Sequence, residues 1–127
     1  MKNKYLNGKG KGEYLYDYSH DILMFKFKDR DYDKSLEFDD NDLTLDIDTE
    51  GFITGITIYE ASKVFKINKT ALNNIKEWIF SSKINDKKVI VQLKFAPVLR
   101  NKSVMYSQDF IRETSENVNN CEAVCSV

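Results

Sequence analysis

Two stretches in the first half of the chain constrain the fold more than any other feature of the sequence. Residues 16–23 read YDYSHDIL and residues 48–62 read DTEGFITGITIYEAS, so each joins turn-forming residues to aromatic and β-branched ones. Asp and Ser favour turns by hydrogen bonding to nearby backbone, and Gly51 can adopt a left-handed conformation at the end of a hairpin loop. Aromatic and β-branched residues favour strands. The two stretches therefore predict two β-hairpins, and Gly51 is predicted to have a positive φ.

The second half of the chain predicts a helix followed by a strand. Residues 68–82 are predicted to form the main helix, because Asn68 can cap it and apolar residues recur one turn apart. Residues 89–95 alternate between apolar and polar types, which is typical of a strand, and Pro97 ends it. The apolar faces of these elements predict one core formed by Leu23, Phe25, Leu45, Ile56, Ile58, Leu72, Ile75, Ile79, Val91 and Leu93.

These elements predict an α+β fold with two layers. A largely antiparallel sheet, built from the two hairpins and the further strand, needs a cover for its apolar face, and the one main helix supplies it. A chain of 127 residues is long enough for one such domain, expected at residues 13–106. Residues 1–12 are rich in lysine and glycine and predict a flexible basic arm. Residues 107–127 are expected to form a short helix and a partly disordered tail.

Composition favours a cytoplasmic protein. No stretch approaches the roughly 18 apolar residues of a membrane-spanning helix, and no apolar run follows the N-terminal lysines as in a secretion signal. Cys121 and Cys125 lie in the last seven residues. Without a nearby histidine they supply at most half of a zinc site, so a reduced tail, a local disulfide and a shared metal all stay open.

An acidic segment at residues 29–42 is the strongest candidate for metal binding. Calcium takes about six to eight oxygen ligands, which closely spaced carboxylates can supply. The spacing approaches that of an EF-hand loop, but Lys34 stands where the turn needs glycine, and Asp40 replaces the bidentate glutamate. A solvated acidic loop and a loose calcium site both stay open. The loose site would use Glu37, Asp39, Asp40 and Asp42.

Charge is distributed unevenly between the two halves of the chain. Residues 29–50 hold ten acidic residues against two basic ones, whereas residues 51–106 hold ten basic residues against three acidic ones. Nucleic-acid binding through the basic second half requires these charges on one face, while lysines scattered over several elements only promote solubility. The sequence favours the second interpretation, and nucleic acid is an alternative partner.

No catalytic site is predicted. His20 is the only histidine, and it lies in a predicted turn beside Asp21 without a marked serine or cysteine nucleophile. We therefore expect a structural or solvent-exposed histidine and no enzymatic activity. The expected cofactor is none, unless the acidic segment binds Ca²⁺.

The chain resembles the DUF2283 family of small domains of unknown function over residues 13–63. The family begins with a Tyr-Asp-x-x-x-Asp-x-Leu pattern and continues with Asp-x-x-Gly-x-x-x-Gly-Ile-x-Ile, closed by Ala-Ser. The corresponding residues here are Tyr16, Asp17, Asp21 and Leu23, then Asp48, Gly51, Gly55, Ile56, Ile58, Ala61 and Ser62. His20 departs from the Ala or Ser that is usual there, and this chain continues beyond the point where the family domain commonly stops.

The resemblance implies the fold of the first half and carries no established activity. Some members of the family look like partners of small toxin-type proteins, which hints at an antitoxin-like role. The sequence thus favours a non-enzymatic protein-binding or regulatory module, with an unknown protein partner or self-association and no contact with a membrane. Weak calcium binding and nucleic-acid binding are the two alternatives.

Overall fold

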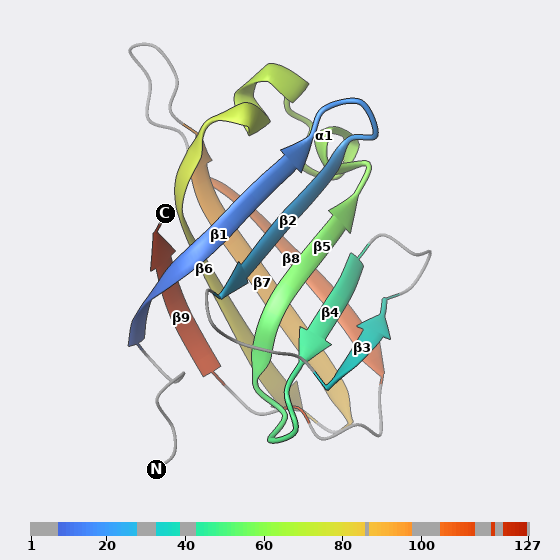
Figure 1. The fold of residues 1–127 in the computed structure, drawn as a ribbon. Helices are drawn as coiled ribbons and strands as arrows, with labels where there is room; N and C mark the ends of the chain where they lie inside the picture. Colours follow the sequence, from blue (N-terminus) through green and yellow to red (C-terminus); the bar gives the residue numbers. More distant parts are fainter. Residues whose placement is uncertain are drawn as a thin grey trace.

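The computed structural model describes residues 8–27, 33–38, 43–85, 87–97, 105–113, 118 and 121–126 (Figure 1). Within these residues the chain forms nine strands, one short α-helix and one 3₁₀ helix. The strands are β1 (Gly8–Asp17), β2 (Ile22–Phe27), β3 (Lys34–Glu37), β4 (Leu43–Ile47), β5 (Ile53–Tyr59), β6 (Ile75–Asn85), β7 (Lys88–Pro97), β8 (Tyr106–Glu113) and β9 (Cys121–Ser126). The helices are α1 (Ala61–Phe65) and the 3₁₀ helix η2 (Lys69–Asn73).

The strands form one hydrogen-bonded sheet in the order β3-β4-β5-β2-β1-β9-β6-β7-β8. Neighbours are antiparallel throughout, except that β1 and β9 pair in parallel. Figure 1 shows that the sheet is folded into two layers, with β1 to β5 in front and β6 to β9 behind. The pairing between β1 and β9 therefore joins the two layers.

Both predicted hairpins are present. β1 and β2 pair through a turn in which Asp17 lies opposite Ile22, and β4 pairs with β5. Gly51 has a φ of 88°, which confirms the predicted left-handed conformation at the end of the second hairpin. The predicted strand at residues 89–95 forms the centre of β7.

The core lies between the two layers and is rich in aromatic residues. The ring centroids of Phe25 and Trp78 are 4.6 Å apart, and those of Phe27 and Phe80 are 5.4 Å apart. Each pair joins a front strand, β2, to a back strand, β6. Of the ten predicted core residues, nine are buried, and Ile79 is only half-buried.

The predicted main helix at residues 68–82 is wrong. The segment forms η2 and then most of β6, which pairs with β7 and β9. Buried side chains alternate along this strand from Trp78 through Phe80 to Ser82. The spacing of Ile75 and Trp78 resembles a helical turn because the β6–β7 register is irregular between them. Aromatic and β-branched residues here favour a strand once partners lie on both sides.

Three further predictions require correction. The helix expected after residue 107 is instead β8, followed by β9 in the middle of the sheet. β1 begins at Gly8, so the end of the predicted basic arm at residues 1–12 belongs to a strand. The acidic segment at residues 29–42, expected to be mainly loop, contains β3.

The α+β class therefore holds only in a loose sense, because the fold is mostly antiparallel sheet with a single short α-helix in the described residues. A second layer of strands covers the front layer where a helix was expected. α1 is confined to five residues because Glu60 and Lys66, which flank it, both adopt the left-handed conformation. No helix in the part of the chain described by the structure is long and apolar enough to cross a membrane.

Candidate protein-docking face

Asp21 connects the first hairpin to α1. It follows the β1–β2 turn with a φ of 58°, and its side chain is buried. The Tyr16 hydroxyl donates to Asp21 Oδ1 at 2.5 Å, and the Ser62 backbone N–H donates to the same oxygen at 3.0 Å. The Ser62 hydroxyl donates to Oδ2 at 2.6 Å. Because Ser62 lies in the first turn of α1, Asp21 caps that helix from a position 41 residues away in the sequence.

The hydrogen bonds keep the Asp21 carboxylate ionised in spite of its burial. Burial alone would raise its pKa, but donation from Ser62 and Tyr16 outweighs this effect and holds the pKa below its usual value. Burial and the hydrogen bond to Asp21 both raise the pKa of Tyr16, so its hydroxyl stays protonated and continues to donate. The Ser62 hydroxyl is occupied by the same carboxylate, which makes it a structural donor.

The other turn residues of the two motifs also have structural partners. Asp48 Oδ1 accepts from the backbone N–H groups of Glu50 at 2.9 Å and Phe52 at 3.0 Å, which fixes the β4–β5 turn. A Cβ atom at Gly55 would lie 3.1 Å from Lys26 Cβ, so the neighbouring strand approaches closely at this glycine. These contacts explain both motifs through folding and assign them no reaction.

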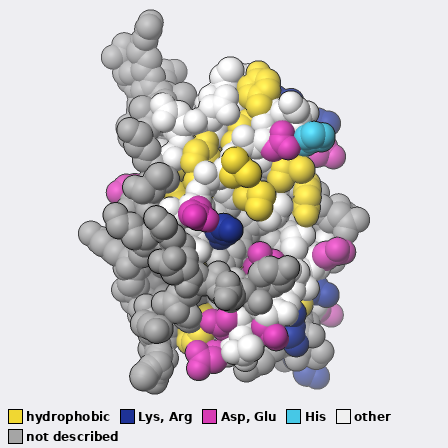
Figure 2. Space-filling view, viewed as in Figure 1, with side chains coloured by type: hydrophobic (Ala, Val, Ile, Leu, Met, Phe, Trp, Pro, Cys, Tyr) yellow, Lys and Arg dark blue, Asp and Glu magenta, His cyan; other side chains and the backbone are white. Residues whose placement is uncertain are grey.

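The outward face of the front layer carries a cluster of apolar side chains, which we call the outer patch: Leu15, Ile22, Met24 and Tyr59. The register places Leu15 opposite Met24, and Ile22 opposite Tyr59. All four alternate with residues that are buried or packed against the core, so they point away from it. Leu15 is 59% exposed and Tyr59 is 37% exposed, while Ile22 and Met24 are half-buried. Figure 2 shows apolar side chains gathered on this face.

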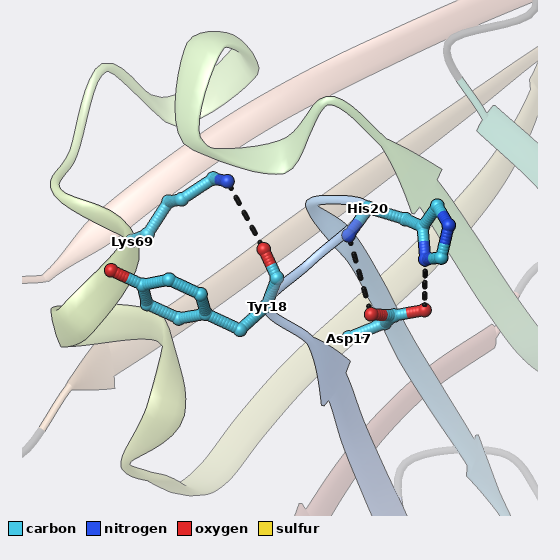
Figure 3. A network of polar contacts seen from close by, with 4 residues as sticks. All are labelled: Asp17, Tyr18, His20 and Lys69. Atoms are coloured by element: carbon cyan, nitrogen blue, oxygen red, sulfur yellow. Dashed lines mark hydrogen bonds and ion pairs between the residues drawn. The ribbon is translucent and has the colours of Figure 1, made fainter.

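Polar groups border the outer patch at both ends. At the lower end, Lys26 Nζ lies 3.4 Å from Glu13 Oε1 in the next row of the sheet. At the upper end, the His20 backbone N–H donates to Asp17 Oδ1 at 3.2 Å, and His20 Nδ1 lies 2.8 Å from Asp17 Oδ2 (Figure 3). The contact with His20 lowers the pKa of Asp17. These charges limit the apolar surface along the strands.

Tyr18 and Lys69 hold the β1–β2 turn against η2. Lys69 Nζ donates to the Tyr18 carbonyl oxygen at 3.0 Å and lies 5.1 Å from the centroid of its ring (Figure 3). The Tyr18 side chain is 47% exposed, which adds an accessible aromatic ring near the upper end of the patch. As predicted, His20 is an exposed turn residue.

Most of the predicted metal site lies outside the residues that the structure describes. Glu37 is exposed on β3, whereas Asp39, Asp40 and Asp42 lie outside the described residues. Within the described ranges, no three His, Cys, Asp or Glu side chains converge in a way that could hold a metal ion. Asp46 accepts a hydrogen bond from the Ser35 hydroxyl at 2.6 Å, so it serves the β3–β4 pair.

Six lysines of the second half lie at two separate ends of the molecule, while Lys94 lies within β7. Lys63, Lys66 and Lys69 belong to α1, η2 and their connection, which precede the start of β6. Lys83, Lys87 and Lys88 lie at or near the hairpin that ends β6 and begins β7. The ten residue steps along β6 from Ile75 to Asn85 span about 33 Å. This separation disfavours a single basic face for nucleic acid.

The outer patch is not apparent from the sequence alone. A signal was present, because Met24 interrupts the polar face of a strand and Leu15 faces away from the flanking Tyr14 and Tyr16. The pairing of β2 with β5, which brings Tyr59 beside Ile22, connects residues far apart in the chain. No local pattern fixes that register.

Comparison with known proteins gives one result, which lies within the first half of the chain. Residues 14–62 match the DUF2283 family, which is described as a protein of unknown function. The match spans β1 from Tyr14 onwards through Ser62 of α1, and so includes Asp21, its partners and the outer patch. No curated protein matches the chain. No solved structure matches it either.

Proposed function

We propose that this protein is a non-enzymatic binding module that docks a partner protein on the outer patch. The outer patch is the observation that carries this function. The outward face of an antiparallel sheet is usually polar where it meets water, yet three adjacent strands here present Leu15, Met24, Ile22 and Tyr59. Contiguous exposed apolar side chains bordered by charges are typical of protein-interaction sites.

An amphipathic helix is the partner element that fits this surface best. Three strands spaced by about 4.8 Å extend roughly 10 Å across, which is close to the diameter of an α-helix with its side chains. A helix lying along β2 could place apolar residues on Met24 and Ile22. Polar residues at the two ends of that helix would then face the Glu13–Lys26 pair and the Asp17–His20 pair.

The structural roles of the polar side chains in the two motifs support a binding role. The Asp21, Ser62 and Asp48 side chains are engaged in capping and turn formation, so none is left as a nucleophile or base. More specifically, we propose an antitoxin-like regulator, which covers a helix of a small toxin-type protein in the cytoplasm. The matching family is described as being of unknown function, so this form rests on our proposal, with which the dimensions of the outer patch are compatible.

Site-specific photo-crosslinking in the native host tests the docking face. A photoreactive amino acid placed at Leu15 should capture a defined partner, whereas the same amino acid at Lys83, exposed on the back layer, should not. With the purified partner, Leu15→Asp should raise Kd by at least about tenfold, because a charge would face an apolar surface. Lys83→Asp should leave Kd unchanged. Equal capture from both positions, or equal effects of both substitutions, would exclude this face as the docking site.

A further inference from the structure

The two edges of the sheet differ in how well they are protected against pairing with another chain. β3 is only four residues long, and its exposed side chains include Lys34 and Glu37. β8 is eight residues long, contains neither lysine nor proline, and pairs with β7 in an unbroken register. Edge strands are normally blunted by short length, charged side chains (lysine above all), proline or a bulge. β8 is longer than β3, unbroken and without lysine or proline, and its charged residues are Asp109, Arg112 and Glu113.

β8 also carries a share of the exposed apolar surface. Among the described residues, five large apolar or aromatic side chains are exposed, and two of them, Met105 and Ile111, lie on or directly before β8. Met105 is 57% exposed and Ile111 is 54% exposed. They are six residues apart, so both point to the same face of the sheet. Within the described part of the chain, β8 is the terminal strand and has β7 as its single paired neighbour.

We propose that two copies of the chain pair through the free edges of β8, antiparallel about a two-fold axis at Gln108. Directly opposed residues in an antiparallel pair lie on the same face, so the axis must pass through a residue position. With Gln108 at the axis, Met105 lies opposite Ile111 of the second copy. Tyr106 then lies opposite Phe110, and Ser107 lies opposite Asp109.

Neighbouring registers are less favourable because of their side-chain pairs. An axis at Asp109 places two carboxylates directly opposite each other, and an axis at Ile111 places Asp109 opposite Glu113. Like charges in directly opposed positions destabilise a sheet. An axis at Phe110 places Ile111 against Asp109. Of these four registers, the one centred on Gln108 is the one that places the exposed apolar residues Met105 and Ile111 opposite each other and contains no like-charge pair.

A charge-pairing experiment tests both the dimer and its register. Sedimentation equilibrium is measured under reducing conditions, so that Cys121 and Cys125 cannot link two copies. The natural chain should form a dimer with a Kd between about 1 µM and 1 mM, which is the affinity range expected for a small interface. Met105→Lys and Ile111→Glu should each weaken the dimer by about tenfold, since each places a charge against an apolar side chain at both ends of the pair.

The double variant M105K/I111E should restore dimerisation, because in this register each introduced lysine meets an introduced glutamate of the second copy. Leu15→Lys, a charge on the outer patch, serves as the matched control and should leave the dimer unchanged. Circular dichroism of each variant checks that the fold is retained, as expected for exposed positions. A monomer at all concentrations, a dimer lost with Leu15→Lys, or a double variant as weak as the singles would each overturn the pairing.

Discussion

At the scale of single residues, Asp21 connects the first hairpin to α1. Its carboxylate accepts hydrogen bonds from a strand residue, Tyr16, and from a helix residue, Ser62, while its backbone carbonyl accepts from the Ala61 N–H at 3.0 Å. A buried carboxylate is costly unless its oxygens are satisfied. Because donors surround both oxygens, the negative charge is retained and positioned at the start of α1.

Replacing this carboxylate should reveal how much it stabilises the fold. Asp21→Asn keeps a residue that tolerates the left-handed backbone, but its amide NH₂ group cannot accept from the donors of Ser62. We expect a loss of roughly 1.5–3 kcal/mol in the free energy of unfolding at pH 7, measured by urea denaturation. Asp33→Asn, at an exposed position, should change it by less than about 0.5 kcal/mol.

The pH dependence of this loss follows from the lowered pKa of Asp21. In the unfolded chain the carboxyl titrates near its ordinary value of about 3.9, and in the folded protein it titrates lower. Its stabilisation is therefore fully present above that value and is lost as the pH falls through the folded-state pKa. The gap between the natural chain and Asp21→Asn should shrink as the pH is lowered from about 5 towards 2. A gap that stays constant over this range would contradict the role of the ionised carboxylate.

At the scale of elements, local sequence patterns were sufficient to predict the structure where turn and strand signals agreed. The segments around Asp48 and Gly51 carry both signals, and their hairpin was predicted correctly. Residues 68–82 gave conflicting signals, because the apolar spacing suited a helix while the aromatic and β-branched content suited a strand. Pairing with β7 and β9 decided the outcome, and the second of these partners lies about forty residues further along the chain.

Substitutions at two neighbouring positions on β6 test whether this segment is a strand or the predicted helix, because the two structures predict different losses of stability. Phe80 is fully buried against Phe27, so Phe80→Ala should lower the free energy of unfolding by about 3–5 kcal/mol. Ile79 points to the other face and is half-buried, so Ile79→Thr should cost less than about 1.5 kcal/mol. Urea denaturation of both variants checks the difference. Ile79 would be the more sensitive position if residues 68–82 were helical.

Calcium binding by the acidic segment at residues 29–42 stays a prediction. Glu37, Asp39, Asp40 and Asp42 lie within six residues of sequence, and a bound cation would relieve the repulsion between their carboxylates. Because no glycine shapes the segment around an ion, we expect weak affinity, with a Kd of about 10⁻⁴–10⁻³ M. An NMR titration should give saturable shifts confined to this segment, and Asp40→Asn should abolish them. Diffuse, unsaturable shifts on all acidic residues would indicate a solvated charge cluster.

For the whole molecule, the sequence predicted most of the front layer and, in the back layer, the strand β7 but not the strands around it. The front layer, apart from β3, is built mainly from the two hairpins, whose turn and strand signals lie in adjacent stretches of sequence. The back layer depends on β9 inserting between β1 and β6, which joins the two ends of the chain. The outer patch was missed for a related reason, since it exists only after three strands are aligned.

The two layers should depend on each other for stability. The front layer and α1 fall within residues 8–66, and their buried face includes Leu23, Phe25 and Phe27. In the whole chain this face is covered by Trp78, Phe80 and Phe95 of the back layer. A fragment of this size has a small core even when fully covered, and without the back layer its apolar face would meet water.

We therefore expect the fragment of residues 8–66 to show no cooperative thermal transition as a monomer, although the whole chain should unfold cooperatively. Circular dichroism melts, together with light scattering to establish the monomeric state, measure this difference. Phe25→Ala in the whole chain provides the companion test, because it removes a ring that contacts both Trp78 and Phe95 and should cost about 3–5 kcal/mol. If the monomeric fragment melted cooperatively and Phe25→Ala cost less than about 1 kcal/mol, the front layer would be an independent folding unit. The contacts between the layers would then contribute little to its stability.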